Sequence, residues 1–265
     1  MHTLVLKLIV TPVLIGGASL AGRRWGPGVS GWLVGLPFTS GPIAFFLALD
    51  HGLAFAAAAA VGTLTGTISQ AAFALSYAWL SLRYRWPLAM VGSCAAFAAA
   101  TAALEYLALP LPLIFLLVLA VLAATLRLLP RVTHASVAGT PARWDIPVRM
   151  VVATAFVLAL TGVAPVLGSR LSGLLTPFPL YATILAVFAH RLQGPAAATS
   201  VLRGLLFGLF AFTTFFLVLA ALIEGVGLGA AFAASMSAAL VIQAAALGLL
   251  RRKMGKDVSP RPPAS

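Results

Sequence analysis

Charged residues are scarce in this 265-residue chain. They make up 8% of it, whereas soluble domains carry roughly 25%. Hydrophobic residues make up 62% of the chain, and its mean hydropathy is +1.07. A soluble fold could not bury that much apolar surface, so the composition indicates a polytopic membrane protein.

Cysteine and acidic residues are also rare. The single cysteine, Cys94, lies in an apolar stretch, which excludes an internal disulfide and a thiolate metal site. Seventeen Lys and Arg against five Asp and Glu give a net charge of +12. Basic residues between long apolar spans set membrane orientation, so we expect no nucleic-acid partner. The chain also has no nucleotide-binding loop, metal cluster or nucleophile arrangement, which predicts no enzyme, no metal and no cofactor.

The apolar stretches are long enough to cross a bilayer as helices. We predict nine transmembrane helices, at 3–22, 28–50, 53–82, 86–107, 110–129, 147–167, 170–192, 195–224 and 226–250. The polar, proline-rich residues 252–265 predict a disordered cytoplasmic tail.

Two halves of the chain resemble each other at a constant offset of 142 residues. The matched pairs are Lys7 with Arg149, Ser30 with Ser172, Gly31 with Gly173, Pro37 with Pro179, Gly52 with Gly194, Gly62 with Gly204, and Gly66 with Gly208. We interpret this as a duplication: repeat 1 in 1–108 and repeat 2 in 147–251, with a linker helix and a cytoplasmic loop in 109–146. The linker helix adds one crossing and inverts repeat 2. The expected fold is an all-α membrane protein with 4+1+4 inverted-topology repeats and a proline-interrupted second helix in each.

The distribution of basic residues predicts the orientation of the chain. If the N-terminus is periplasmic, the residues on the cytoplasmic side are Arg23, Arg24, Arg83, Arg85, Arg127, Arg131, Arg143, Arg149, Arg191, Arg251, Arg252, Lys253, Lys256 and Arg261. Only Lys7 and Arg170 fall on the outer side, and Arg203 lies inside a span. We therefore expect a cytoplasmic C-terminus.

The two interrupted helices are the expected site. Proline removes a backbone donor, so Pro37 frees the carbonyl of Leu33 and Pro179 that of Leu175. Such groups must face protein or a polar cavity. The half-helix beyond each break also presents free amides that favour an anion. Paired broken helices are typical of a transporter's binding site, although both prolines could simply shape packing. The predicted substrate-binding residues are Pro37, Thr39, Ser40, Gly41, Thr176, Pro179, Tyr181, Thr183 and Arg203.

Other residues have predicted supporting roles. Arg203 lies too deep for an ordinary interface anchor, so we expect it at a cavity or an anionic ligand, with snorkelling as the alternative. The candidate gating or electrostatic residues are Lys7, Arg149, Arg170, His190 and Arg191, of which Lys7 and Arg149 could equally be interface anchors. The small residues expected to pack the two long helices of the halves together are Gly62, Gly66, Gly204 and Gly208.

Repeat 2 carries a motif that resembles a known family. A cation stands thirty positions before a proline in a Gly-Leu-x-x-x-x-Pro stretch, and a glycine follows fifteen positions later. The motif residues are Arg149, Gly173, Leu174, Phe178, Pro179 and Gly194. They resemble the small four-helix GlpM-like proteins of the bacterial inner membrane, and repeat 1 matches less well because Trp32 and Leu36 replace a leucine and a phenylalanine. The resemblance implies a location in the bacterial cell inner membrane but no molecular activity.

These patterns together favour a secondary permease. It would move a small anionic or amphipathic metabolite, or a lipid-linked compound, by alternating access between inverted repeats, with membrane lipids as its surroundings. A passive ion or small-solute channel, a non-transporting envelope-assembly factor and a homodimeric state all stay open.

Overall fold

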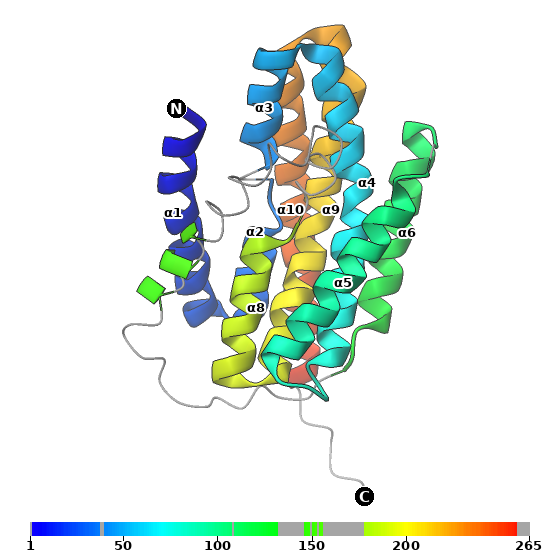
Figure 1. Ribbon diagram of the computed structural model, residues 1–265. Coiled ribbons are helices and arrows are strands. Elements are labelled where there is room, and N and C mark those ends of the chain that lie inside the picture. Colours follow the sequence, from blue (N-terminus) through cyan, green and yellow to red (C-terminus); the bar gives the residue numbers. More distant parts are fainter. Residues whose placement is uncertain are drawn as a thin grey trace, which may run out of the picture.

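The computed structural model describes residues 2–37, 40–107, 109–131, 146–148, 150–152, 154–155 and 178–258. The named elements within these ranges are all α-helices (Figure 1). They are α1 (His2–Trp25), α2 (Pro27–Val34), α3 (Ser40–His51), α4 (Leu53–Leu80), α5 (Trp86–Leu104), α6 (Leu111–Leu128), α8 (Leu180–Gln193), α9 (Pro195–Val226) and α10 (Leu228–Val258).

Five of the described helices are long and apolar enough to cross a membrane. They are α4, α5, α6, α9 and the part of α10 at Leu228–Gly248. These helices fall on the spans expected at 53–82, 86–107, 110–129, 195–224 and 226–250. The span expected at 147–167 lies mostly outside the described residues. The chain is therefore a helical protein with the character of a membrane protein.

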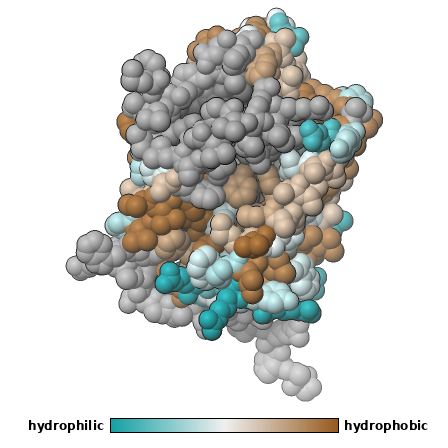
Figure 2. All heavy atoms as spheres, viewed as in Figure 1, coloured by the Kyte–Doolittle hydropathy of each residue, from teal (hydrophilic) through white to brown (hydrophobic). Residues whose placement is uncertain are grey.

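The long helix α9 lies at the centre of the bundle. It packs against α2, α4, α6, α8 and α10, whereas α1 lies at the edge and packs mainly on α2 (Figure 1). Side chains such as Leu202, Leu206 and Phe215 on α9 are fully buried. Figure 2 shows hydrophobic residues over the middle of one face and hydrophilic residues along its lower edge, as expected where helices meet lipid.

The predicted interruption of the second helix is confirmed. α2 ends at Val34, the chain turns through Gly35, Leu36 and Pro37, and α3 begins at Ser40. The carbonyl of Leu33, which we expected to be free, instead accepts the N–H of Leu36 at 3.3 Å. The end of the helix has tightened into an i+3 turn, which satisfies that group locally.

The second interruption is described only on its C-terminal side. Pro179 directly precedes the start of α8, and its carbonyl accepts the N–H of Thr183 at 2.8 Å. Residues 170–177 lie outside the described residues, so the freed carbonyls predicted there are not tested.

Three helix boundaries in the two halves keep the 142-residue offset. α4 begins at 53 and α9 at 195, α5 begins at 86 and α10 at 228, and α3 ends at 51 and α8 at 193. The matched glycines before α4 and α9 also share one backbone conformation, with φ of 89° at Gly52 and 87° at Gly194. Residues with a side chain rarely adopt this conformation, which explains a glycine at both places.

α4 and α9 run in opposite directions. The last turns of α4 contact the last turns of α8 through Tyr77 and His190, and only Gly194 separates α8 from the start of α9. The end of α4 therefore lies near the start of α9 (Figure 1). The indole of Trp79 on α4 also donates to the carbonyl of Leu128 at 3.0 Å, which places the end of α6 at this same end of the bundle.

The end of α10 lies beyond the predicted boundary. α10 continues to Val258, through residues that we expected to begin a disordered tail at 252. Arg251, Arg252 and Lys253 are good helix formers, so helix propensity favours this extension. Residues 259–265 lie outside the described residues.

Candidate functional site

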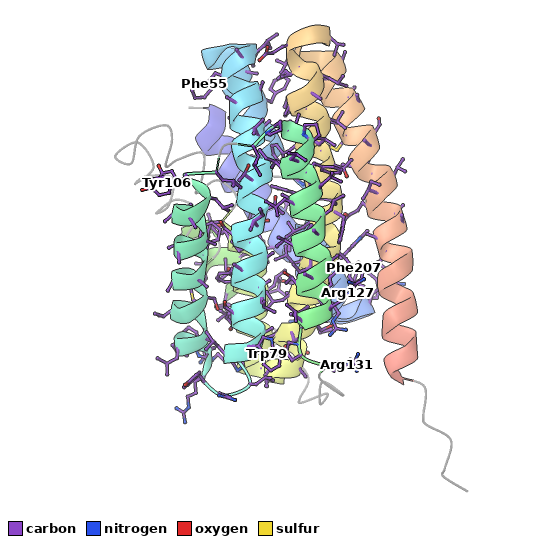
Figure 3. The ribbon with its side chains drawn as sticks, turned by 90° about the vertical axis from the view of Figure 1, so that its right-hand side faces the viewer. Phe55, Trp79, Tyr106, Arg127, Arg131 and Phe207 are labelled. Carbon is purple, nitrogen blue, oxygen red and sulfur yellow. The ribbon has the colours of Figure 1, made fainter. Side chains whose placement is uncertain are left out.

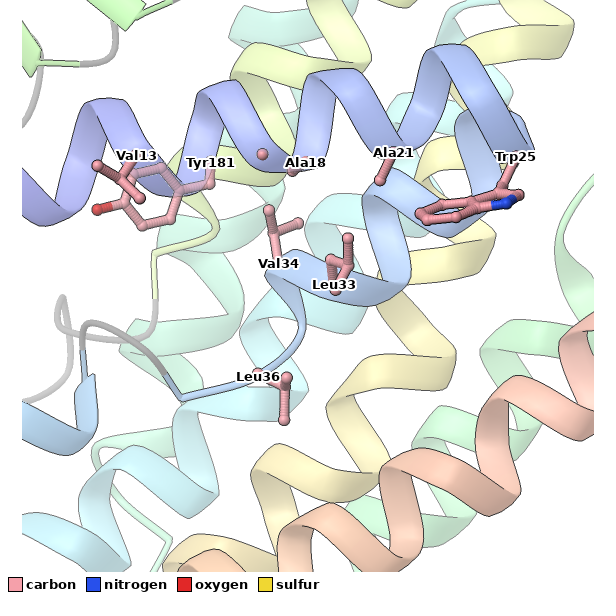
Figure 4. A pocket seen from close by; sticks show the side chains of 9 residues that line it. Val13, Ala18, Ala21, Trp25, Leu33, Val34, Leu36 and Tyr181 are labelled. Carbon is pink, nitrogen blue, oxygen red and sulfur yellow. The ribbon is translucent and has the colours of Figure 1, made fainter.

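A pocket of about 290 Å³ lies beside the first interruption and beside Pro179, where the second interruption is predicted (Figure 4). It is formed between α1, the end of α2 and the start of α8. Its lining residues are Val13, Gly17, Ala18, Ala21, Trp25, Leu33, Val34, Leu36 and Tyr181. Leu36 directly precedes Pro37, and Tyr181 stands two positions after Pro179. The pocket therefore brings together the surroundings of two prolines that are 142 residues apart.

The lining is apolar with few polar atoms. Tyr181 is 8% exposed and contributes a hydroxyl at one end of the pocket, near Val13, while the indole of Trp25 lies at the other end (Figure 4). An unaccompanied anion would lose its hydration in such a site and gain few donors in return. The pocket thus does not match the anion-binding spot predicted from the helix ends, and it fits an apolar group instead.

The end of the pocket at Trp25 is basic. Arg23 and Arg24 occupy the last turn of α1, and the guanidinium of Arg24 lies 5.5 Å from the centroid of the Trp25 ring. This cation–π contact keeps a positive charge beside the aromatic wall. The site combines an apolar body with a cationic mouth.

A close crossing of α2 and α9 positions the first interruption. An added Cβ at Gly31 would overlap the carbonyl oxygen of Val201, and one at Gly35 would lie 2.5 Å from the Cα of Gly208. The two backbones thus touch, which only glycine permits. An added Cβ at Gly204 would likewise overlap the carbonyl oxygen of Gly28.

This crossing corrects one prediction about the glycines. Gly204 and Gly208 do pack closely, but against α2 and not against the glycines of α4. Among the described atoms, none lies within 4 Å of an added Cβ at Gly62, so the packing role of Gly62 stays a prediction. Gly66 is buried within α4. The 142-residue offset predicted close packing at the small residues of α9, but it could not show which helix faces them.

Trp32 and Gln243 hold α2 against α10. The side-chain amide of Gln243 donates to the carbonyl of Trp32 at 2.9 Å, and the indole of Trp32 donates to the carbonyl of Gln243 at 3.2 Å. Gln243 is only 3% exposed. Reciprocal bonds in a buried place fix the last turn of α2, from which the interruption starts.

Aromatic side chains pack against the first interruption and just before Pro179. Phe178, directly before Pro179, makes edge contacts with Phe73 on α4 and Phe97 on α5, at centroid distances of 5.9 and 5.2 Å. At the first interruption, an added Cβ at Gly41 would lie 3.6 Å from the ring of Phe215 on α9. Phe73 and Phe215 are both fully buried and are themselves 142 residues apart.

Only some of the predicted site residues line the pocket. Tyr181 lines the pocket, and Pro37 and Pro179 are buried next to it. Ser40 and Thr183 are buried but do not line it, and the hydroxyl of Thr183 donates to the carbonyl of Pro179 at 2.8 Å. Gly41 likewise packs on α9. Thr39 and Thr176 lie outside the described residues.

Arg203 has a structural partner. Its guanidinium donates to the carbonyl of Pro130 at 3.2 Å, two residues beyond the end of α6, and it does not line the pocket. The prediction that Arg203 belongs to the binding site is therefore not supported. Carbonyls that follow a helix end carry partial negative charge and commonly accept from basic side chains, which explains the arginine.

The candidate gating residues are only partly described. His190 packs against Tyr77, whose hydroxyl lies 3.4 Å from His190 Nδ1, and Arg191 is exposed in the last turn of α8. Arg149, Arg170 and the side chain of Lys7 lie outside the described residues. Their electrostatic role stays a prediction.

Sequence reasoning missed the contribution of α1. Five of the lining residues come from this helix: Val13, Gly17, Ala18, Ala21 and Trp25. A signal was present, since Gly17 and Ala21 form a small-xxx-small pair on one helix face.

No family model, curated protein or solved structure matches this chain. Within the residues that the structure describes, no three His, Cys, Asp or Glu side chains gather as a metal site would require.

Proposed function

We propose that this chain is a secondary permease of the bacterial inner membrane. It moves an amphipathic solute by alternating access, and its site is the pocket beside the two interruptions. The observation that carries this proposal is that Leu36 and Tyr181, next to Pro37 and Pro179, line one cavity. Broken helices that meet at one cavity are the usual binding site of transporters built from inverted repeats.

Three features support the inverted repeats that alternating access requires. Three helix boundaries keep the 142-residue offset, and α4 and α9 run antiparallel. The third feature is the reciprocal placement of two equivalent phenylalanines: Phe73 of repeat 1 contacts Phe178 of repeat 2, and Phe215 of repeat 2 lies beside Gly41 of repeat 1. Each half thus packs a ring on the interruption of the other. Nine crossings as 4+1+4, and the relation to GlpM-like proteins, are part of this proposal.

The charged residues support an orientation with the C-terminus in the cytoplasm. Arg127 lies in the last turn of α6 and Arg131 follows the helix, and both lie toward the lower end of Figure 3 together with Trp79. Phe55, at the start of α4, lies near the upper end. Basic residues gathered at one end mark the cytoplasmic side.

The two interruptions provide the hinges. Between Val34 and Ser40 the chain leaves the helix, so the two half-helices can change their mutual angle at small cost in hydrogen bonds. The buried crossing of α2 with α9 holds one half-helix, which leaves α3 and α1 to open and close the pocket. During transport, first one half of each broken helix and then the other covers the solute.

Cysteine accessibility tests alternating access directly. In a Cys94→Ala background, Leu36→Cys should react with a membrane-impermeant maleimide applied from either side of oriented vesicles. Leu82→Cys, in the exposed turn after α4, is the matched control and should react from the cytoplasmic side alone. Reaction of Leu36→Cys from neither side would refute the proposal.

Flux measurements distinguish a carrier from a channel and from an envelope-assembly factor. Purified protein in liposomes should give saturable uptake of at least one amphipathic solute in a panel graded by chain length. Uptake that rises linearly with concentration would identify a channel instead. Absence of flux across the whole panel, combined with co-purification of one fixed protein partner, would identify an assembly factor.

A further inference from the structure

The chemistry of the pocket points to a particular occupant. Its body is apolar, and its mouth is flanked by Trp25 and by the basic last turn of α1. An occupant must therefore carry an apolar group for the body and negative charge for the mouth. This inference rests on the proposed function, because it names the substrate class of the same pocket.

The length of the pocket fits one leaflet of the bilayer. On α1 the lining extends from Val13 to Trp25, twelve residues, or about 18 Å at 1.5 Å per residue. Half of the hydrocarbon core measures about 15 Å. The pocket thus follows α1 from the headgroup level, where tryptophan and arginine are favoured, to near the bilayer centre. A lipid chain of one leaflet spans the same depth.

The volume of the pocket restricts the occupant further. A peptide helix 18 Å long and about 10 Å wide would need roughly 1,400 Å³, far more than the pocket offers. At about 30 Å³ for a water-sized group, 290 Å³ accommodates roughly ten such groups. One unbranched alkyl chain satisfies both the length and the volume.

We propose that the pocket binds one acyl chain of an anionic phospholipid of the cytoplasmic leaflet, with the headgroup at Arg23 and Arg24. The cytoplasmic leaflet is rich in anionic lipid, and basic residues close to its surface attract it. The hydroxyl of Tyr181 closes the inner end of the pocket, beside the second interruption (Figure 4). The permease accordingly handles an anionic lipid, or a lipid-linked compound with that headgroup charge.

The test is lipid retention measured by native mass spectrometry. The full chain is loaded in nanodiscs with equal phosphatidylglycerol and phosphatidylcholine, extracted in neutral detergent and washed stepwise. The wild type should keep one phosphatidylglycerol per chain, with at least tenfold preference over phosphatidylcholine. Equal retention of the two lipids would overturn the proposed headgroup site.

Filling the pocket tests the acyl chain. Among the described atoms, none lies within 4 Å of an added Cβ at Gly17, so Gly17→Leu can place its side chain in the pocket while improving helix propensity. Each methylene displaced should cost about fourfold in affinity, so retention should fall at least tenfold. Leu20→Phe, on the exposed face of α1, is the matched control and should retain lipid as the wild type does. Unchanged retention in Gly17→Leu would overturn the proposal.

Charge neutralisation tests the mouth of the pocket. Arg23→Gln with Arg24→Gln should reduce the preference for phosphatidylglycerol to less than twofold. Arg83→Gln with Arg85→Gln, two exposed cations in the turn between α4 and α5, should leave it unchanged. An equal loss in both double variants would show general surface attraction and overturn the site.

The lipid inference and the permease can fail separately. Selective retention without flux of any solute upholds the lipid site and refutes the permease. Saturable flux without retained lipid upholds the permease and refutes the lipid site.

Discussion

The crossing of α2 and α9 makes a sharp prediction, because its glycines permit no side chain. In Gly204→Ala, the new Cβ would lie 2.8 Å from the carbonyl carbon of Gly28 and 2.8 Å from the amide nitrogen of Trp32. Favourable contacts between heavy atoms lie at about 3.5–4.0 Å, so the helices must separate by at least about 1 Å. The obstacle is backbone and cannot rotate away.

The expected cost follows from this overlap. Overpacking a close interface costs about 1–3 kcal/mol, and we expect the upper end for Gly204→Ala. At roughly 2–4 °C per kcal/mol for a chain of this size, a loss of about 3 kcal/mol lowers the Tm by about 6–12 °C. The measurement is thermal unfolding of the purified protein in detergent, followed by size-exclusion recovery of the folded species.

The repeat supplies a matched control. Gly62 occupies the equivalent position in α4 (62 + 142 = 204), and an added Cβ there meets none of the described atoms within 4 Å. Gly62→Ala should therefore stabilise the protein by about 0.5–1 kcal/mol, because alanine favours a helix interior. The reasoning is refuted if Gly204→Ala is neutral, or if the two substitutions have the same effect.

Two further substitutions test the packing around the site. Phe178→Ala should cost about 3 kcal/mol of stability, because Phe178 contacts two phenylalanines on α4 and α5. Tyr106→Ala should change the stability by less than about 0.5 kcal/mol, because Tyr106 is 88% exposed. Equal losses of Tm in thermal unfolding would contradict this contrast. Arg203→Met should lose about 1.5–3 kcal/mol with its charged hydrogen bond to Pro130 and leave the affinity for a transported solute unchanged, with the exposed Arg191→Met as control. A change in solute affinity at unchanged Tm would return Arg203 to the binding site.

Much of the fold follows from local sequence patterns. Hydropathy located the membrane-type helices to within a few residues, since the apolar length needed to cross a bilayer is a property of each segment alone. Pro37 predicted the interruption after Val34, because proline cannot continue the helical bonding. The 142-residue offset predicted that Gly52 and Gly194 would occupy equivalent places, and both have the same positive φ.

The candidate site was predicted only in part. The 142-residue offset predicted a site beside both prolines, and Tyr181, close to Pro179, does line the pocket. The site was expected to be polar because Ser40 follows Pro37 closely in the sequence and Thr183 follows Pro179 closely, and both carry hydroxyls. In the structure Thr183 donates to its own helix, so its hydroxyl is already satisfied.

The amino-acid sequence by itself determined that this is a helical membrane-type protein, where its helices begin and where one of them breaks, because hydropathy, proline and glycine act within a few residues of themselves. Only the tertiary structure decided that Gly204 meets α2, that Arg203 serves the end of α6, and that α1 forms the wall of the pocket. Those outcomes depend on which faces meet across the bundle, and a helix with apolar residues on all sides carries no local signal of its partner.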